Sequence, residues 1–95
     1  MYRVQIFKGD ELCGEVDCDK ATAYLGKDAG SLAPMRGWRL GKRQLQLDVR
    51  EDALFLKDAG GLGPVKVNGN AVNEYGPLRS TDVIEVGDYT VRFNI

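Results

Sequence analysis

Hydrophobic and polar residues alternate along most of this chain, which is the pattern of half-buried β-strands. Tyr2, Val4 and Ile6 share one face of the first alternating segment, with polar residues between them. No window shows a helical period, and no internal repeat is visible. The segments predicted as strands are 2–7, 12–18, 23–26, 37–40, 42–49, 53–58, 65–67, a return strand beginning at 72, a short strand within 74–79, 82–86 and 89–93.

Turn residues separate these segments at short intervals. Gly9-Asp10, Asn68-Gly69 and Gly87-Asp88 are predicted as two-residue hairpin turns, because glycine and asparagine accept positive φ. Residues 60–64 (Gly-Gly-Leu-Gly-Pro) predict an irregular loop, and 28–37 predict another. About eleven short, mostly antiparallel strands in 95 residues predict an all-β sandwich, with binding sites in the loops at its ends.

The size and charge of the chain narrow the expected class. Ninety-five residues fit one domain, 1–95, with one thin core. No apolar run reaches the roughly 18 residues of a membrane span, and no signal-peptide core is present, so we expect a cytoplasmic location without direct membrane insertion. The net charge of −1 argues against nucleic-acid binding over the whole surface. A local basic patch is still expected in residues 20–43, where Asp28 is the single acidic residue. The six basic residues of this stretch are Lys20, Lys27, Arg36, Arg39, Lys42 and Arg43.

Catalytic and metal sites are not expected. The chain has no histidine, which removes the commonest general base, and no serine or threonine has an evident activating partner. Cys13 and Cys18 should point to opposite faces of one strand, as two reduced structural thiols, and two cysteines without histidine do not make a usual zinc site. The glycine loop at 60–64 lacks the Gly-Lys-Ser/Thr and the following helix of a phosphate-binding loop. We therefore predict no catalytic residue and no cofactor.

Several short motifs carry a family resemblance. Leu56 and Asp58, a six-residue loop, and then Val67-Asn68-Gly69 resemble the second half of a forkhead-associated (FHA) domain, in which Leu-x-Asp leads into a Ser-x-Asn-Gly-Thr loop and Val-Asn-Gly. The stretch from Pro77 to Phe93 (Pro-Leu-Arg-x-x-Asp-Val-Ile-x-Val-Gly-Asp-Tyr-x-Val-Arg-Phe) resembles FHA C-termini. The resemblance spans about Tyr24 to Phe93 and implies an FHA-like β-sandwich.

The resemblance implies a phosphothreonine site whose polar residues have been replaced. The family's phosphate-contacting arginine falls on Lys27, and its serine, arginine and buttressing histidine fall on Gly41, Lys42 and Gln44. The serine, asparagine, glycine and threonine of the second loop fall on Gly61, Gly63, Pro64 and Val65. Losing the serine at 41 and the asparagine at 63 removes about 3–6 kcal/mol of contacts, or two to four orders of magnitude in affinity.

The resulting expectation is a degenerate FHA domain that acts as a phospho-independent protein-interaction module. Trp38 has two open roles, core packing or an exposed hot spot beside Arg36 and Arg39. Gly-Trp-Arg before Lys42-Arg43 resembles the N-terminal FHA module of Flp-pilus or secretion ATPases, which implies a partner subunit of a bacterial secretion or pilus-assembly apparatus. The predicted binding residues are Lys27, Arg36, Trp38, Arg39, Gly41, Lys42, Arg43, Gly61, Leu62 and Gly63.

Two alternatives remain open at this stage. One is a phosphothreonine-peptide reader that uses Lys27, Lys42 and Arg43 in place of the lost contacts. The other is an anion or nucleic-acid surface built from Arg36, Arg39, Lys42 and Arg43, which steep salt dependence would reveal. Oligomeric state and the identity of the partner do not follow from the sequence.

Overall fold

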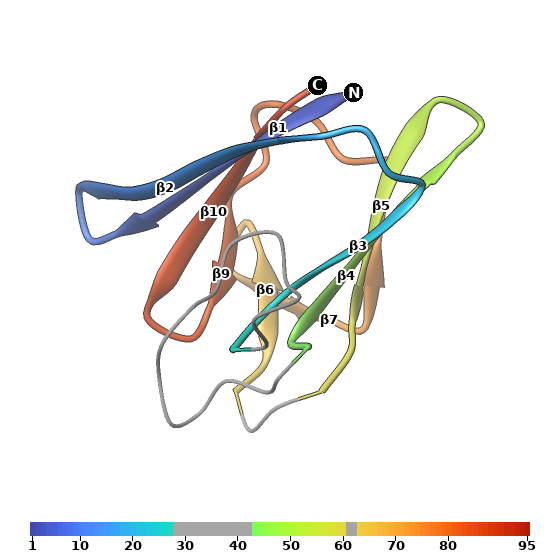
Figure 1. The fold of residues 1–95 in the computed structure, drawn as a ribbon. Helices are drawn as coiled ribbons and strands as arrows, with labels where there is room; N and C mark the ends of the chain where they lie inside the picture. Colours follow the sequence, from blue (N-terminus) through green and yellow to red (C-terminus); the bar gives the residue numbers. More distant parts are fainter. Residues whose placement is uncertain (28–42, 61–62) are drawn as a thin grey trace.

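Ten β-strands in two antiparallel sheets make up the fold (Figure 1). The computed structural model describes residues 1–27, 43–60 and 63–95. Sheet A has the order β2-β1-β10-β9-β6-β7, and sheet B has the order β3-β4-β5-β8. The strands are β1 (Tyr2–Lys8), β2 (Glu11–Cys18), β3 (Thr22–Leu25), β4 (Leu45–Arg50), β5 (Ala53–Asp58), β6 (Val65–Val67), β7 (Asn70–Val72), β8 (Glu74–Tyr75), β9 (Ile84–Val86) and β10 (Tyr89–Asn94).

The predicted all-β sandwich is confirmed, with differences in detail. The return strand predicted to begin at 72 is β7, which spans Asn70–Val72 and ends there. The described residues form ten strands where about eleven were expected, and the predicted strand at 37–40 lies outside them. The strand predicted over 82–86 begins only at Ile84, because Asp82 turns its carboxylate into a hydrogen-bond network. None of the described residues is helical, so this part of the chain holds no helix that could cross a membrane.

Tight turns join neighbouring strands as the glycine and asparagine positions predicted. Asn68 and Gly69 have φ values of 52° and 87°, as a two-residue hairpin turn between β6 and β7 requires. Gly9 and Gly87 also have positive φ, at the turns that follow β1 and β9. These turns hold consecutive strands in the antiparallel registers that bring their apolar faces to the same side.

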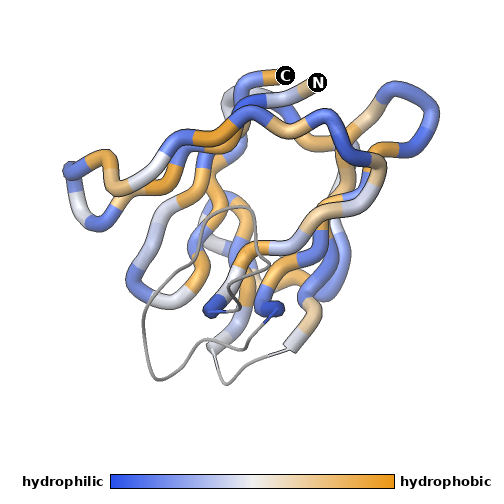
Figure 2. Tube along the Cα trace, viewed as in Figure 1, coloured by the Kyte–Doolittle hydropathy of each residue, from blue (hydrophilic) through white to orange (hydrophobic). Residues whose placement is uncertain are grey.

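The core lies between the two sheets and follows the alternation of the sequence (Figure 2). Tyr2, Val4 and Ile6 of β1 are buried together, as predicted. Leu45 and Leu47 of β4 are fully buried, but Val49, the next inward-facing position of the same strand, is 38% exposed. Val49 lies near the end of β4, where it borders a surface pocket.

Both cysteines are free, but only one belongs to the core. Cys18 is buried at the end of β2, whereas Cys13 is exposed, so the prediction of two structural thiols holds for Cys18 alone. Around Cys13 the pairing between β1 and β2 shifts register after Ile6, which is typical of a β-bulge. β2 is an edge strand of sheet A. The bulge and the exposed acids Glu15 and Asp17 protect this edge from pairing with another chain.

A buried carboxylate holds the Asn68-Gly69 turn against the segment that precedes β9. Asp82 is 5% exposed and accepts hydrogen bonds from Asn68 Nδ2 at 2.9 Å, from the Arg79 main-chain N–H at 2.8 Å and from the Tyr75 hydroxyl at 3.4 Å. Burial by itself would raise the pKa of the Asp82 carboxyl, but these donors together hold that pKa below its usual value. Asn68 Oδ1 in turn accepts from the Val83 N–H at 2.9 Å.

Candidate protein-interaction site

The strand ends that flank residues 28–42 and 61–62 meet at one end of the sandwich, opposite the chain termini (Figure 1). The pairing of β3, β4 and β5 brings them together, since Leu45 lies opposite both Leu25 and Asp58. Val65 then begins β6 in the facing sheet. We call the described residues at this end, 25–27, 43–44, 58–60 and 63–64, the apex. They are the framework on which any apical binding surface is built.

Gln44 links its own segment of the apex to the other three segments. Its main-chain N–H donates to the Leu25 carbonyl at 2.9 Å, and its own carbonyl accepts from the Ala59 N–H at 2.9 Å. Its side-chain Nε2 donates to the Gly63 carbonyl at 3.1 Å. Gln44 is only 1% exposed, so these bonds are shielded from water, and a lost partner would leave a polar group buried. The position that the FHA resemblance assigns to a buttressing histidine therefore still braces the loops.

The loop that follows β5 begins with a local side-chain turn. The Asp58 carboxylate accepts from the Gly60 N–H at 3.1 Å, an Asx-turn that reverses the chain directly after the strand. Gly60 has a φ of 140°, a conformation that side chains with a Cβ rarely adopt. The Asx-turn at the start of the loop thus accounts for the aspartate of the Leu-x-Asp motif and for the glycine at 60.

Gly63 leaves an open position at the apex. A Cβ placed on Gly63 would meet nothing within 4 Å, and the residue does not have positive φ. A side chain would fit here, so the glycine is not required by packing among the described residues. Val65, which takes the place of the family's threonine, is fully buried as the first residue of β6. The described part of the second loop therefore presents no polar side chain at the position of the asparagine or of the threonine.

Two basic residues of the predicted site belong to the apex. Lys27 is exposed just after β3. Arg43 is also exposed, and its guanidinium carbon lies 4.6 Å from the centre of the Tyr24 ring, a cation–π contact that fixes the cation against the outer face of sheet B. The sequence analysis missed this role of Tyr24. Its signal was an aromatic residue at an outward position of the strand that leads into the predicted site.

Three of the ten predicted binding residues can be placed, and they fall in one region. Lys27 and Gly63 both flank Gln44 through its bonds to their segments, and Arg43 directly precedes it. The other seven predicted residues lie outside the described ones: Arg36, Trp38, Arg39, Gly41, Lys42, Gly61 and Leu62. Within residues 1–27, 43–60 and 63–95, no group of three or more acidic or cysteine side chains is arranged to hold a metal ion.

Solved structures with the same fold are FHA domains. The FhaA FHA domain, solved in complex with the intracellular domain of Rv3910, matches with a TM-score of 0.85 and 17% identity over 99% of this chain and 100% of that one. This chain has the FHA β-sandwich fold. The FHA domain of CT664 from Chlamydia trachomatis matches with a TM-score of 0.82 and 16% identity over 97% of this chain and 94% of that one.

A plant FHA domain shows how far the fold is shared. It comes from an Arabidopsis thaliana protein and matches with a TM-score of 0.76 and 21% identity over 98% of this chain and 83% of that one. No protein-family model and no curated protein matches the sequence. At these identities the likeness establishes the FHA fold alone, so function must be argued from the residues of this chain.

Proposed function

We propose that this domain is a non-catalytic protein-interaction module that binds its partner through the apex without requiring phosphothreonine. The observation that carries the proposal is the bond from Gln44 Nε2 to the Gly63 carbonyl. It keeps the loop framework of an FHA domain in place while the residue at 63 offers no side chain. A rigid framework with small, apolar loop residues favours recognition by shape and contact area over a clasp around one anion.

Two exposed cations do not supply the binding free energy that the lost contacts would have contributed. Charge-assisted hydrogen bonds contribute about 1.5–3 kcal/mol each, and the serine and asparagine positions of the family are both glycine here. Lys27 and Arg43 are exposed, and exposed ion pairs contribute about 0–1 kcal/mol and weaken with salt. Phosphate attraction at the apex is therefore a minor part of the proposed binding.

We propose a cytoplasmic setting in a bacterial secretion or pilus-assembly apparatus. The support is the Gly37-Trp38-Arg39 stretch and its resemblance to the FHA modules of Flp-pilus or secretion ATPases. Protein partners suit the fold, since the FhaA FHA domain was solved with the intracellular domain of another protein. In this setting the partner is another subunit of the apparatus.

A phosphothreonine reader is the second candidate, using Lys27, Lys42 and Arg43. The observation in its favour is that Lys27 and Arg43, both exposed, belong to two segments of the apex that the Gln44–Leu25 hydrogen bond joins. One structure with this fold, at a TM-score of 0.85 and 17% identity, comes from work on phosphothreonine-dependent FHA interactions. The two candidates differ in whether the phosphate changes the affinity.

Paired peptide titrations followed by amide NMR signals separate the two candidates. A phosphothreonine peptide library and its unphosphorylated twin should shift the signals of residues 25–27, 43–44 and 58–64 equally little. Subunits of the secretion or pilus apparatus should shift the same signals saturably. Saturable binding of phosphopeptides alone, abolished by Lys27→Ala and kept by the exposed control Lys8→Ala, would instead establish the reader.

A further inference from the structure

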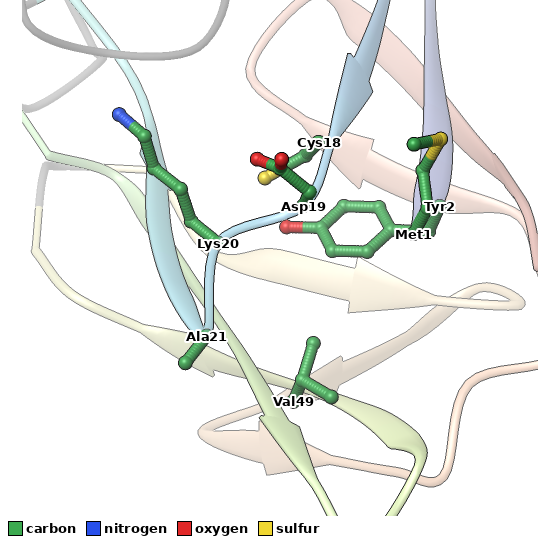
Figure 3. A pocket seen from close by; sticks show the side chains of 7 residues that line it. All are labelled: Met1, Tyr2, Cys18, Asp19, Lys20, Ala21 and Val49. Atoms are coloured by element: carbon green, nitrogen blue, oxygen red, sulfur yellow. The ribbon is translucent and has the colours of Figure 1, made fainter.

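The pocket that Val49 borders lies at the end of the sandwich opposite the apex, where the chain crosses from sheet A to sheet B (Figure 1 and Figure 3). Its volume is about 210 Å³. This corresponds to several water molecules, at roughly 30 Å³ of liquid volume each. The side chains that line it come from both sheets and the crossing segment: Met1, Tyr2, Cys18, Asp19, Lys20, Ala21 and Val49.

The core is incompletely covered at this pocket. Val49 follows Leu45 and Leu47 in the inward-facing pattern of β4, yet it is 38% exposed while both leucines are fully buried. Ala21 lies beside it, since the Val49 N–H donates to the Ala21 carbonyl at 2.8 Å. An apolar group that entered the pocket would therefore complete a hydrophobic surface that the chain itself leaves open.

A buried hydroxyl in the same pocket has no hydrogen-bond partner of good geometry, and the Cys18 thiol is a weak polar group beside it. Tyr2 is 4% exposed, its oxygen is almost inaccessible to water, and this oxygen makes no hydrogen bond of acceptable geometry. Burial, then the neighbouring Cys18 thiol and the Asp48 carboxylate, raise the pKa of the Tyr2 phenol above its ordinary value. The phenol therefore stays neutral at physiological pH and keeps a proton to donate. Unsatisfied buried hydroxyls are uncommon in folded proteins.

Two charged side chains at the rim complete the arrangement. Asp19 and Lys20 are exposed, and within the described part of the chain neither makes a hydrogen bond or an ion pair. Figure 3 shows the Asp19 carboxylate above the Tyr2 hydroxyl, with Val49 on the opposite side. Because the hydroxyl is almost inaccessible, a ligand that reaches it must displace a neighbouring side chain, and Figure 3 shows Asp19 beside it while Lys20 points away.

We propose that this pocket binds a carboxamide group carried on a short apolar body. The carbonyl oxygen accepts from the Tyr2 hydroxyl, the amide N–H₂ donates to the Asp19 carboxylate, and the apolar body packs on Val49 and Ala21. An alkylammonium offers no acceptor to Tyr2. A carboxylate offers no donor to Asp19 and would bring a second negative charge beside it. The two rim side chains Asp19 and Lys20 carry opposite charges, which suits a ligand without net charge.

The carboxamide has two possible sources, a free small molecule or a glutamine side chain of a partner protein. Amide NMR signals of the 95-residue protein would be followed during titration with isobutyramide, with isobutylammonium, and with a short capped glycine-glutamine-glycine peptide. Isobutyramide should shift the signals of Cys18, Asp19, Lys20, Ala21 and Val49 saturably, and isobutylammonium should not. Tighter binding of the peptide assigns the site to a protein partner, and tighter binding of isobutyramide assigns it to a small molecule.

Three variants connect the binding to the pocket. Tyr2→Phe should weaken isobutyramide binding about two- to tenfold, which is the loss of one hydrogen bond. Ala21→Leu should abolish it by filling the pocket from an exposed position that does not disturb the core. Tyr24→Phe, which removes a tyrosine hydroxyl on sheet B away from the pocket, should leave it unchanged. Binding of neither amide probe, or equal binding by wild type and Ala21→Leu, would overturn the proposal.

Discussion

Gln44 Nε2 lies 3.1 Å from the carbonyl oxygen of Gly63, and this bond joins the start of β4 in sheet B to the loop that enters β6 in sheet A. The two groups belong to segments that enter different strands, β4 and β6. The bond therefore sets the distance between the two halves of the apex, whichever partner the apex binds.

Replacing Gln44 by leucine should destabilise the fold while keeping the volume of the side chain nearly the same. The Gly63 carbonyl loses its Gln44 donor, and a buried polar group left without a partner costs about 1–3 kcal/mol. Urea unfolding at neutral pH measures the loss. Gln46→Leu is the matched control, because Gln46 is half-buried on the outer face and its side chain bonds, among the described residues, to Asp48 alone. An equal effect of both variants would mean that the Gln44 bond is not special.

Gly76 should not tolerate alanine, although it lies in an exposed segment. A Cβ on Gly76 would overlap the ring of Phe55, and Arg50 also packs on this ring, with its guanidinium carbon 4.7 Å from the ring centre. Overpacking of this kind costs about 1–3 kcal/mol. Thermal unfolding of Gly76→Ala, Phe55→Ala and the double variant tests the cause, since the cost of the alanine should largely vanish once the ring is gone. Gly14→Ala, where a Cβ meets nothing within 4 Å, is the control glycine.

Asp82 should make stability depend on pH in the acid range. The folded pKa of Asp82 lies below the unfolded value of about 3.9, so its contribution is complete above that value and is lost as the pH falls through the folded pKa. Asp82→Asn should cost about 2–3 kcal/mol at pH 7, because an amide cannot accept from all three donors. The difference between wild type and Asp82→Asn should shrink between pH 5 and pH 2 (roughly the window of a depressed carboxyl).

The exposed Arg3–Asp17 pair is the control for the behaviour of Asp82. Arg3 Nε donates to Asp17 Oδ1 at 2.8 Å, and this hydrogen bond lowers the pKa of the Asp17 carboxyl despite a small opposing effect of burial. Because both side chains are about half exposed, salt should screen the effect of Asp17→Asn. The effect of Asp82→Asn should persist in high salt. A salt-sensitive Asp82→Asn effect would mean that the network is open to solvent.

Tyr2→Phe should be neutral or slightly stabilising at pH 7, because it removes a buried hydroxyl that has no partner. Burial raises the pKa of the folded phenol above its ordinary value near 10, so the wild type should lose stability as the pH rises above that value, and the variant should lose less. Urea unfolding at pH 7 and at alkaline pH compares the two proteins. A clear destabilisation by Tyr2→Phe at pH 7 would show that the hydroxyl has a partner in solution.

The sandwich was predictable because most strands carry a two-residue period and most tight turns a glycine or asparagine suited to positive φ. The turn at Glu51 and Asp52, with φ values of 49° and 65°, is an exception. Val4 and Val91 follow the alternation fully, and Asn68-Gly69 forms the turn that its sequence predicted. Val49 shows where the pattern fails, since a strand period says which face a residue takes but not whether another element covers that face. Coverage depends on where the ends of the two sheets meet.

The apex was predictable only as far as a motif could be aligned. The position of Gln44 came from the FHA resemblance. Its bonds to Leu25, Ala59 and Gly63 depend on distances between separate chain segments, which no local sequence pattern contains. The Arg43–Tyr24 contact was missed for the same reason, because it joins residues on neighbouring strand ends. The remaining predicted site residues, in 28–42 and 61–62, stay predictions.

Restoring the two missing polar residues should restore phosphothreonine binding. Gly63→Asn fits without a clash, because a Cβ there meets nothing within 4 Å and the backbone does not have positive φ. Combined with Gly41→Ser, it returns two contacts of about 1.5–3 kcal/mol each, so a phosphothreonine peptide should bind about 10²–10⁴-fold more tightly than it binds the wild type. Calorimetric titration with phosphorylated and unphosphorylated peptides measures the gain.

Gly14→Asn is the control for the restored apex, since it adds the same side chain at an unhindered position in β2 and should leave peptide binding unchanged. Tight phosphopeptide binding by the wild type would show that Lys27, Lys42 and Arg43 already suffice, and the phospho-independent function would be wrong. No gain in the double variant, with the fold intact, would mean that the arginine positions now held by Lys27 and Lys42 matter as well, because lysine cannot form the two-pronged bond of a guanidinium. Adding Lys27→Arg to the double variant decides that point.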